Sequence, residues 1–350
     1  MFADLNLGEM TPLTASLLLG AVLGLVFGVL AQRSRFCIRR GLVAESTDRK
    51  QAFGTWIMAL ATALLGTQAA VATGLISFAD HRFIADAMPI ASIALGGLVF
   101  GAGMVLTRGC ISRQTVLLGT GNTRSLIVIV AFAMVAHATL KGVLAPVRTS
   151  VGSLTVDLGI TSFAGLPGGV AVWTAVLAIA ALTIAVRSGA GWRQLALGGA
   201  IGLLIPAGWV GTGYVLFDDF DPIAMRSLSF TLPWADTLFW TIASSAIPAG
   251  FGVGLTAGVI GGSLIAALIA REFVWQGFET PRQTGRYLLG ASLMGFGGVL
   301  AGGCTVGAGL SGTATLSFAA AFVLVFVIIG ALLTDRVLTG ARGGVAVPAE

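Results

Sequence analysis

The chain contains three cysteines, and each lies in a short polar or glycine-rich stretch between long apolar segments: Cys37 in RSRFCIRRG, Cys110 in LTRGCISRQ and Cys304 in LAGGCTVGAG. No second cysteine or histidine lies at metal-ligand spacing, and an odd number of isolated cysteines does not make a disulfide framework, so we expect neither metal nor disulfide. A neutral thiol is a weak S–H donor with a polarisable sulfur. This chemistry suits an anion whose charge is spread over sulfur, whereas Ser, Lys or Arg would bind sulfate or phosphate better.

The residues around the cysteines also favour an anion site. A helix that begins inside the membrane presents N–H groups and a dipole that attract anions. We therefore expect residues 107–124 and 300–312 to form facing re-entrant loops that hold an anion. The predicted supporting residues are Gly109, Arg113, Gly303 and Thr305, with Arg108 and Arg124 adding positive potential near the inner mouth. Because a weak donor also releases its ligand, three thiols at separate levels could pass an ion along a path.

The composition places these loops in a membrane. Hydrophobic residues make up 56% of the chain and charged residues 10%, against roughly 25% charged in soluble domains. The opening MFADLNLGEM has no basic residue, so it does not resemble a cleaved signal peptide, and we expect the first helix to remain as an anchor. The net charge of +5 is then best attributed to cytoplasmic loops, not to a nucleic-acid partner.

Apolar runs of about 20 residues predict an all-α polytopic protein with about nine transmembrane helices. The expected spans are residues 13–31, 51–76, 90–106, 125–144, 168–186, 195–215, 237–270, 287–301 and 309–333. The run 237–270 is too long for one straight helix and contains Pro248, so we expect it to be broken. The runs 90–106 and 287–301 are short, and each continues directly into a glycine-cysteine loop.

The basic residues predict the orientation of these helices. Residues 33–50 hold six basic and two acidic residues and should be cytoplasmic, whereas the acidic LFDDFDP at 216–222 should lie outside. An odd number of crossings then puts the N-terminus in the periplasm and the C-terminus in the cytoplasm. The protein should therefore lie in the bacterial inner membrane.

The chain repeats itself. GLVFG occurs at 24–28 and 97–101, and in both copies cysteine follows the phenylalanine by ten residues, with arginine three residues after the cysteine. GGVLAGGC at 297–304 matches GMVLTRGC at 103–110 in five of eight positions, on a helix that should run in the opposite direction. We expect one domain over 1–350 with two inverted pseudo-symmetric halves, 13–144 and 195–333, joined by a linker helix at 168–186. Inverted repeats with discontinuous helices are typical of transporters.

These motifs resemble the YeeE/YedE family of bacterial sulfur-compound transporters, and the resemblance covers nearly the whole chain. It implies an hourglass-like inner-membrane fold that takes up thiosulfate. It also implies that three cysteines, matching Cys37, Cys110 and Cys304 here, hand the ion along by S–H hydrogen bonds. A small cytoplasmic sulfurtransferase of the TusA type is the implied partner, and no cofactor is implied.

Two alternatives remain open. The chain could carry another sulfur anion, such as sulfite. It could instead be a membrane-embedded sulfurtransferase or redox protein that forms a persulfide on one cysteine, which normally requires a base or positive group to activate the thiol. Arg35 and Arg39 flank Cys37, but no histidine accompanies any cysteine, so we expect a transporter and not an enzyme. His137, on an apolar span, is expected to be an interior histidine and not a proton relay.

Overall fold

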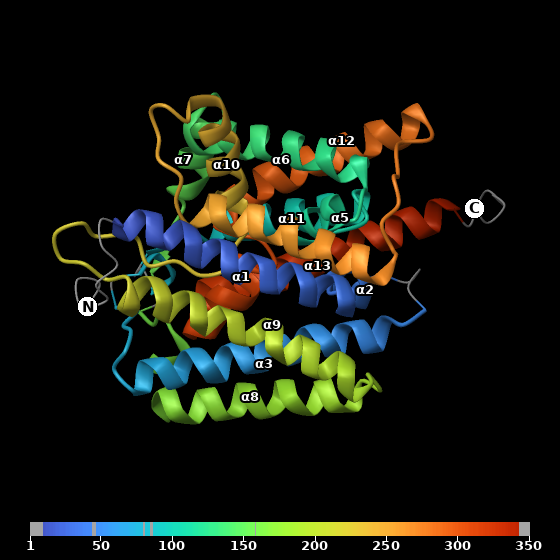
Figure 1. Ribbon diagram of the computed structural model, residues 1–350. Helices are drawn as coiled ribbons and strands as arrows, with labels where there is room; N and C mark the ends of the chain where they lie inside the picture. The colour runs from blue at the N-terminus through green and yellow to red at the C-terminus, as the bar shows by residue number, and fades with distance from the viewer. Residues whose placement is uncertain (1–9, 44–46, 80, 85–86, 158, 343–350) are drawn as a thin grey trace.

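The computed structural model describes residues 10–43, 47–79, 81–84, 87–157 and 159–342. The described chain is almost entirely helical, which confirms the predicted all-α polytopic class (Figure 1). Its one sheet is a short antiparallel pair, β1 (Ala87–Met88) with β2 (Val156–Asp157), in which Ala87 lies opposite Asp157. The N-terminal decapeptide discussed above lies almost wholly outside the described residues.

Nine helices have at least 17 residues each: α1 (Pro12–Ser34), α3 (Arg49–Ala72), α4 (Ile90–Leu106), α6 (Thr123–Lys141), α8 (Gly169–Arg187), α9 (Trp192–Val210), α11 (Phe251–Ala270), α12 (Pro281–Leu300) and α13 (Phe318–Arg342). Shorter helices are α2 (Ile38–Leu42), α5 (Ile111–Gly119), α7 (Ala145–Gly152) and α10 (Thr231–Ala243), and the remaining turns are η2 (Arg82–Ile84), η3 (Phe163–Gly165), η4 (Gly211–Val215), η5 (Gly307–Gly312) and η6 (Thr313–Thr315).

Eight described segments are long and apolar enough to cross a membrane, with α1–α2, α4–α5 and α9–η4 each counted as one. The ninth expected span corresponds to α12, which has 20 residues but carries Arg282 and Arg286 in its first two turns. The expected break in 237–270 is confirmed, since α10 ends at Ala243 and α11 begins at Phe251. The last helix begins at Phe318, not at 309, because the glycine-rich residues 307–315 form π and 3-10 turns and Leu316 has a positive φ of 64°.

Glycines let the helices approach one another closely. Gly20, Gly24 and Gly28 of α1 each face backbone carbonyls of α11, and Gly254, Gly258 and Gly262 of α11 each face backbone carbonyls of α1. Residue numbers rise together in these contacts, so α1 and α11 run parallel. A Cβ at any of these positions would collide with the partner backbone, which is the close approach that small residues permit in membrane helices.

The other close pairs follow the directions expected from the repeat. The helices that carry the two matching GC motifs, α4 and α12, are antiparallel, since Gly96 approaches Gly297 and Gly103 approaches Gly290. The packing of one helix pair is repeated in another. α1 packs on α11 as α9 packs on α3, and α4 packs on α13 as α12 packs on α6. Two related halves would produce this pattern. The predicted bounds of the halves, 13–144 and 195–333, and the role of α8 as linker stay a prediction.

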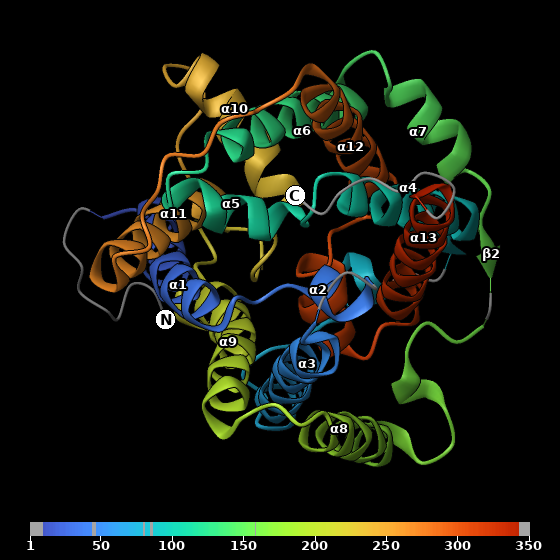
Figure 2. The ribbon, with the colours of Figure 1, turned by 90° about the vertical axis from the view of Figure 1, so that its right-hand side faces the viewer.

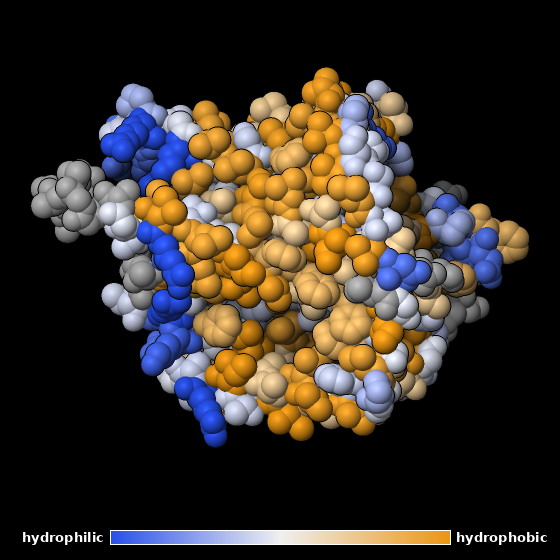
Figure 3. Space-filling model, turned by 180° about the vertical axis from the view of Figure 1, so that it is seen from behind, coloured by the Kyte–Doolittle hydropathy of each residue, from blue (hydrophilic) through white to orange (hydrophobic). Residues whose placement is uncertain are grey.

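Seen along the helices, the long helices surround a centre occupied by α2, α5 and the turns around η5 (Figure 2). On the face seen in Figure 3, a broad apolar belt covers the middle, with hydrophilic residues gathered toward the two ends. This surface agrees with a multi-pass membrane protein. The short elements that follow the three cysteines therefore lie inside a ring of membrane helices.

Candidate functional site: three buried cysteine loops and an outer vestibule

The three cysteine loops share one backbone device. The residue two positions before each cysteine has a positive φ: Arg35 at 50°, Arg108 at 58° and Gly302 at 78°. After α1 and α4 this left-handed residue ends the helix in a Schellman-type arrangement, with Phe36 N–H bonded to Ala31 O and Gly109 N–H bonded to Met104 O. The sequence repeat therefore corresponds to a repeated turn that stops a helix inside the protein and redirects the chain.

Each cysteine then stands at the start of new helical structure. Cys37 is the N-cap residue of α2 and Cys110 that of α5, and the carbonyl of Cys304 accepts from Ala308 N–H at 2.9 Å. All three side chains are buried, with 7%, 2% and 0% of their surface exposed in chain order, so none meets bulk water. Each thiol thus lies at a helical N-terminus, where the backbone dipoles favour an anion.

The tertiary structure brings the three loops together. The side chains of Cys37 and Cys110 interact directly, and Thr305, the neighbour of Cys304, places its hydroxyl beside Cys110. Cys110 Sγ also lies 3.1 Å from Ser112 Oγ. The Thr305 hydroxyl is buried and has no partner at ordinary hydrogen-bond length within the described residues. Cys37 and Cys110, from two distant parts of the chain, therefore lie side by side, and the loop of Cys304 reaches Cys110 through Thr305.

Buried polar side chains hold the loops in place. The amide of Gln114 donates to Thr107 O at 2.7 Å and accepts from Ser125 Oγ at 2.7 Å, which ties the Cys110 loop to α6. Ser92 of α4 donates to Leu300 O at 2.8 Å, which ties the first half to the Cys304 loop. Since buried donors and acceptors are costly to leave unpaired, these bonds define the loop geometry.

The predicted supporting residues surround the cluster. Gly109 packs against Arg113 and Gln114, and Gly303 packs closely against Ala308. The Arg113 guanidinium lies 3.5 Å from the Gln32 side-chain oxygen, and its charge acts on both Cys37 and Cys110. No carboxylate forms an ion pair with Arg113 among the described residues, so it can contribute positive potential to the thiols.

Two other residues lie elsewhere. Arg124 forms an ion pair with Glu279 at 2.9 Å and donates to Gly277 O, so its charge is balanced at the surface. His137 is half-buried and stacks on the exposed ring of Phe239 in α10, with ring centroids 4.6 Å apart, so its expected interior role stays a prediction. Within the described residues no group of three or more His, Cys, Asp or Glu side chains could hold a metal ion.

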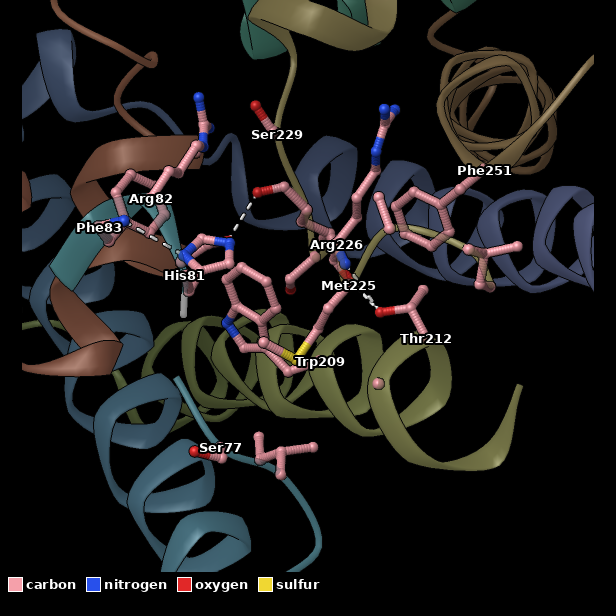
Figure 4. Close-up of a pocket in the computed structure, with 18 of the residues that line it drawn as sticks. Ser77, His81, Arg82, Phe83, Trp209, Thr212, Met225, Arg226, Ser229 and Phe251 are labelled. Carbon is pink, nitrogen blue, oxygen red and sulfur yellow. Dashed lines mark hydrogen bonds between the residues drawn. The ribbon is translucent and has the colours of Figure 1, made fainter. Parts of the chain in front are cut away.

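A cavity of about 1030 Å³, with part of its lining drawn in Figure 4, lies beside the turns that follow Cys304. Val71, at the far end of α3 from residues 33–50, lines it, so on the expected orientation this outer vestibule opens to the periplasm. Its lining includes Gly307 and Ser311, which belong to the turns directly after Cys304. The vestibule therefore ends against the loop that carries the third thiol.

The charged residues of this vestibule, His81, Arg82 and Arg226, are not among the residues predicted from the sequence. The signal that could have found them is the presence of arginine in loops on the expected outer side, against the usual cytoplasmic bias. Burial, helped by the positive charge of Arg82, lowers the pKa of His81 to about 4. Phe83 N–H donates to His81 Nδ1 at 3.3 Å, a bond that the neutral ring accepts.

Comparisons with known proteins gave a family and two relatives. A family model described as sulphur transport matches residues 33–333. The thiosulfate transporter TsuA of Escherichia coli strain K12 is 27% identical over 340 residues, covering 90% of this chain and 92% of the relative. The protein of the same name from Spirochaeta thermophila is 26% identical over 328 residues, covering 89% of this chain and 96% of the relative.

Proposed function

Because this chain belongs to the sulphur transport (YeeE/YedE) family and is a multi-pass sulfur-compound transporter, we propose that its substrate is thiosulfate. The two relatives named above carry thiosulfate in their names. We further propose that the ion enters from the periplasm and passes Cys304, Cys110 and Cys37 in that order, in the inner membrane. The observation that carries this path is the convergence of three buried cysteine loops, with Cys37 beside Cys110 and Thr305, the neighbour of Cys304, also beside Cys110.

The local hydrogen bonds suit a donor role for Cys304. Its sulfur accepts from Gly307 N–H at 3.3 Å, so the S–H proton remains available to the ion. Cys110 has Ser112 as a polar neighbour and the unpaired Thr305 hydroxyl beside it, and both hydroxyls can also donate to an oxyanion. Weak neutral donors hold the ion without trapping it, since conduction requires that each site also release its ligand.

Arg113 supplies the positive charge at the inner end of this path. The charge of Arg113 acts on both Cys37 and Cys110. Arg113 lies on α5, a nine-residue helix whose dipole has its positive end at Cys110. Because Arg113 acts more strongly on Cys37 than on Cys110, a divalent anion leaving Cys110 for Cys37 would stay within the field of this positive charge. A TusA-like cytoplasmic sulfurtransferase would then consume the ion.

Uptake of radiolabelled thiosulfate into proteoliposomes of the purified protein tests the function. We expect uptake well above that of empty liposomes, and no accumulation of labelled sulfate under the same conditions. Uptake of sulfite in place of thiosulfate would reassign the substrate, and uptake of neither would contradict the proposed transport.

A persulfide-forming sulfurtransferase is the second candidate, and the closeness of Cys37 and Cys110 is the observation that favours it. Transfer of the outer sulfur of thiosulfate to a thiol leaves a persulfide and hydrogen sulfite, so atoms and electrons balance without another oxidant. Intact-mass measurement after exposure to thiosulfate distinguishes the two. A stable added sulfur supports transfer chemistry, whereas unmodified thiols together with uptake support passage.

A further inference from the structure

The outer vestibule contains two arginines on opposite walls. Arg82 follows the loop after α3, and Arg226 lies on the segment between η4 and α10. In Figure 4 both side chains extend in the same direction, and Ser229 lies between them in the view. Residues 226–229 therefore carry an arginine and a hydroxyl into the same cavity that Arg82 enters.

The two charges are close enough to act on each other. Loss of solvation, together with the positive charge of Arg226, lowers the pKa of Arg82. Arg82 lies 4.9 Å over the ring of its neighbour Phe83, and no carboxylate forms an ion pair with it within the described part of the chain. Like charges held together in a partly desolvated cavity repel, and a divalent anion between them would offset that repulsion.

The partner of Arg226 can be displaced. Its guanidinium lies 3.3 Å from Asp236, and the side chains are 45% and 49% exposed. An exposed pair of this kind contributes little to stability. An incoming anion can therefore compete with Asp236 for Arg226 at little cost.

Ser229 connects the arginines to the thiol cluster. No hydrogen bond from its hydroxyl is found among the described residues, and the hydroxyl lies against Gly307, where any Cβ would collide with it. Gly307 in turn donates its N–H to Cys304 Sγ. Gly307 would then lie between an oxyanion held at Ser229 and Cys304, the first thiol of the proposed path.

We propose that Arg82, Arg226 and Ser229 form a recruiting site for divalent oxyanions in the vestibule, upstream of the cysteines. This proposal rests on the proposed transport function and adds that oxyanion binding and selection for sulfur take place at two different sites. Guanidinium groups recognise oxyanions through charge and paired N–H donors, so this site accepts sulfate as well as thiosulfate. Selection for the soft sulfur then takes place at Cys304, and sulfate competes for the vestibule without being carried.

Anion binding to the full-length protein in detergent tests the site. Sodium sulfate is titrated at constant ionic strength, with heat and tryptophan fluorescence as readouts, because Trp209 lines the vestibule. We expect R82Q and R226Q each to weaken sulfate binding by roughly tenfold or more, since a hydrogen bond to a charged group contributes about 1.5–3 kcal/mol. S229A should weaken it less, and D236N should strengthen it by freeing Arg226.

R193Q is the matched control, because it removes the same charge at the opposite end of α9, where Arg193 stacks on Trp192. R82K preserves the charge and should retain part of the binding, and each variant is accepted only if its melting temperature equals that of the parent. Unchanged sulfate binding in both R82Q and R226Q would overturn the proposal, as would equal weakening in R193Q.

Uptake separates this proposal from the proposed function. External sulfate should raise the apparent KM for thiosulfate in the parent protein, and this competition should fall in R82Q. Cys304→Ala should lose uptake yet bind sulfate normally. Thiosulfate uptake that external sulfate leaves unaffected would refute the recruiting site and leave the transporter intact. Sulfate binding at the arginines without any thiosulfate uptake would refute the transporter and leave the site intact.

Discussion

The backbone N–H of Gly307 donates a hydrogen bond of 3.3 Å to the sulfur of Cys304. The backbone N–H of Arg40 makes the corresponding contact with Cys37, three residues along the chain in both cases. In both loops the sulfur therefore faces the backbone of the turn that follows it. At Cys304, where the sulfur is the acceptor, the S–H proton is not used in this bond and can be donated to a ligand.

This relationship predicts the effect of truncating Cys304. Cys304→Ala removes the free donor, so we expect the initial rate of thiosulfate uptake to fall at least about tenfold, the equivalent of about 1.4 kcal/mol. Cys304→Ser keeps a hydrogen-bond donor but replaces the sulfur with the smaller oxygen. This variant should retain partial uptake of thiosulfate with weaker discrimination against sulfate. Proteoliposome uptake measures both. Full uptake by Cys304→Ala would contradict the thiol path.

Gln114 should be required for the shape of the Cys110 loop. Gln114→Leu leaves the Thr107 carbonyl and the Ser125 hydroxyl without the partner they share, at a cost of about 1–3 kcal/mol for each buried group. We expect a lower melting temperature and slower uptake. Gln51→Leu replaces an exposed glutamine and is the control. Equal melting temperatures for the two variants would show that the bridge does not stabilise the loop.

The parallel contact of α1 and α11 predicts opposite effects of alanine at two glycines of α11. A Cβ at Gly258 would enter the backbone of Ala21, whereas nothing lies within 4 Å of one at Gly261. Gly258→Ala should therefore destabilise the protein by about 1–3 kcal/mol through overpacking. Gly261→Ala should be neutral or slightly stabilising, since alanine is the better helix former. Thermal unfolding in detergent compares them, and a Gly258→Ala variant as stable as Gly261→Ala would refute the close contact.

The pKa of His81 predicts how stability responds to acid. In the folded protein burial and Arg82 lower this pKa from 6.5 to about 4. Between these values the unfolded chain binds more protons than the folded one, so the contribution of His81 is complete above pH 6.5 and is lost as the pH falls toward 4. We expect the melting temperature of the parent to fall more steeply over this range than that of His81→Gln. Parallel curves for the two proteins would contradict the assignment.

The features predicted correctly from the sequence are those that depend on local composition. Apolar runs of sufficient length predicted the membrane helices, and α4 has the predicted bounds, Ile90–Leu106. Proline and glycine between residues 244 and 250 predicted the break before α11. The matching GC motifs predicted equivalent loops, and their antiparallel helices agree with the expected inversion. These features follow from signals that lie within one turn or one helix of the residues concerned.

Contacts between distant residues depend on helix packing. The sequence predicted that the loops of Cys110 and Thr305 face each other, but not that Cys37 lies against Cys110, because that contact depends on how α1, α4 and α12 pack. The start of α13 at Phe318 likewise depends on the turns that pack in the centre of the helix ring. The vestibule between Arg82 and Arg226 exists because two outer loops, separated by more than a hundred residues, close around one cavity. Such contacts are set by helix packing, and helix packing is a property of the whole chain.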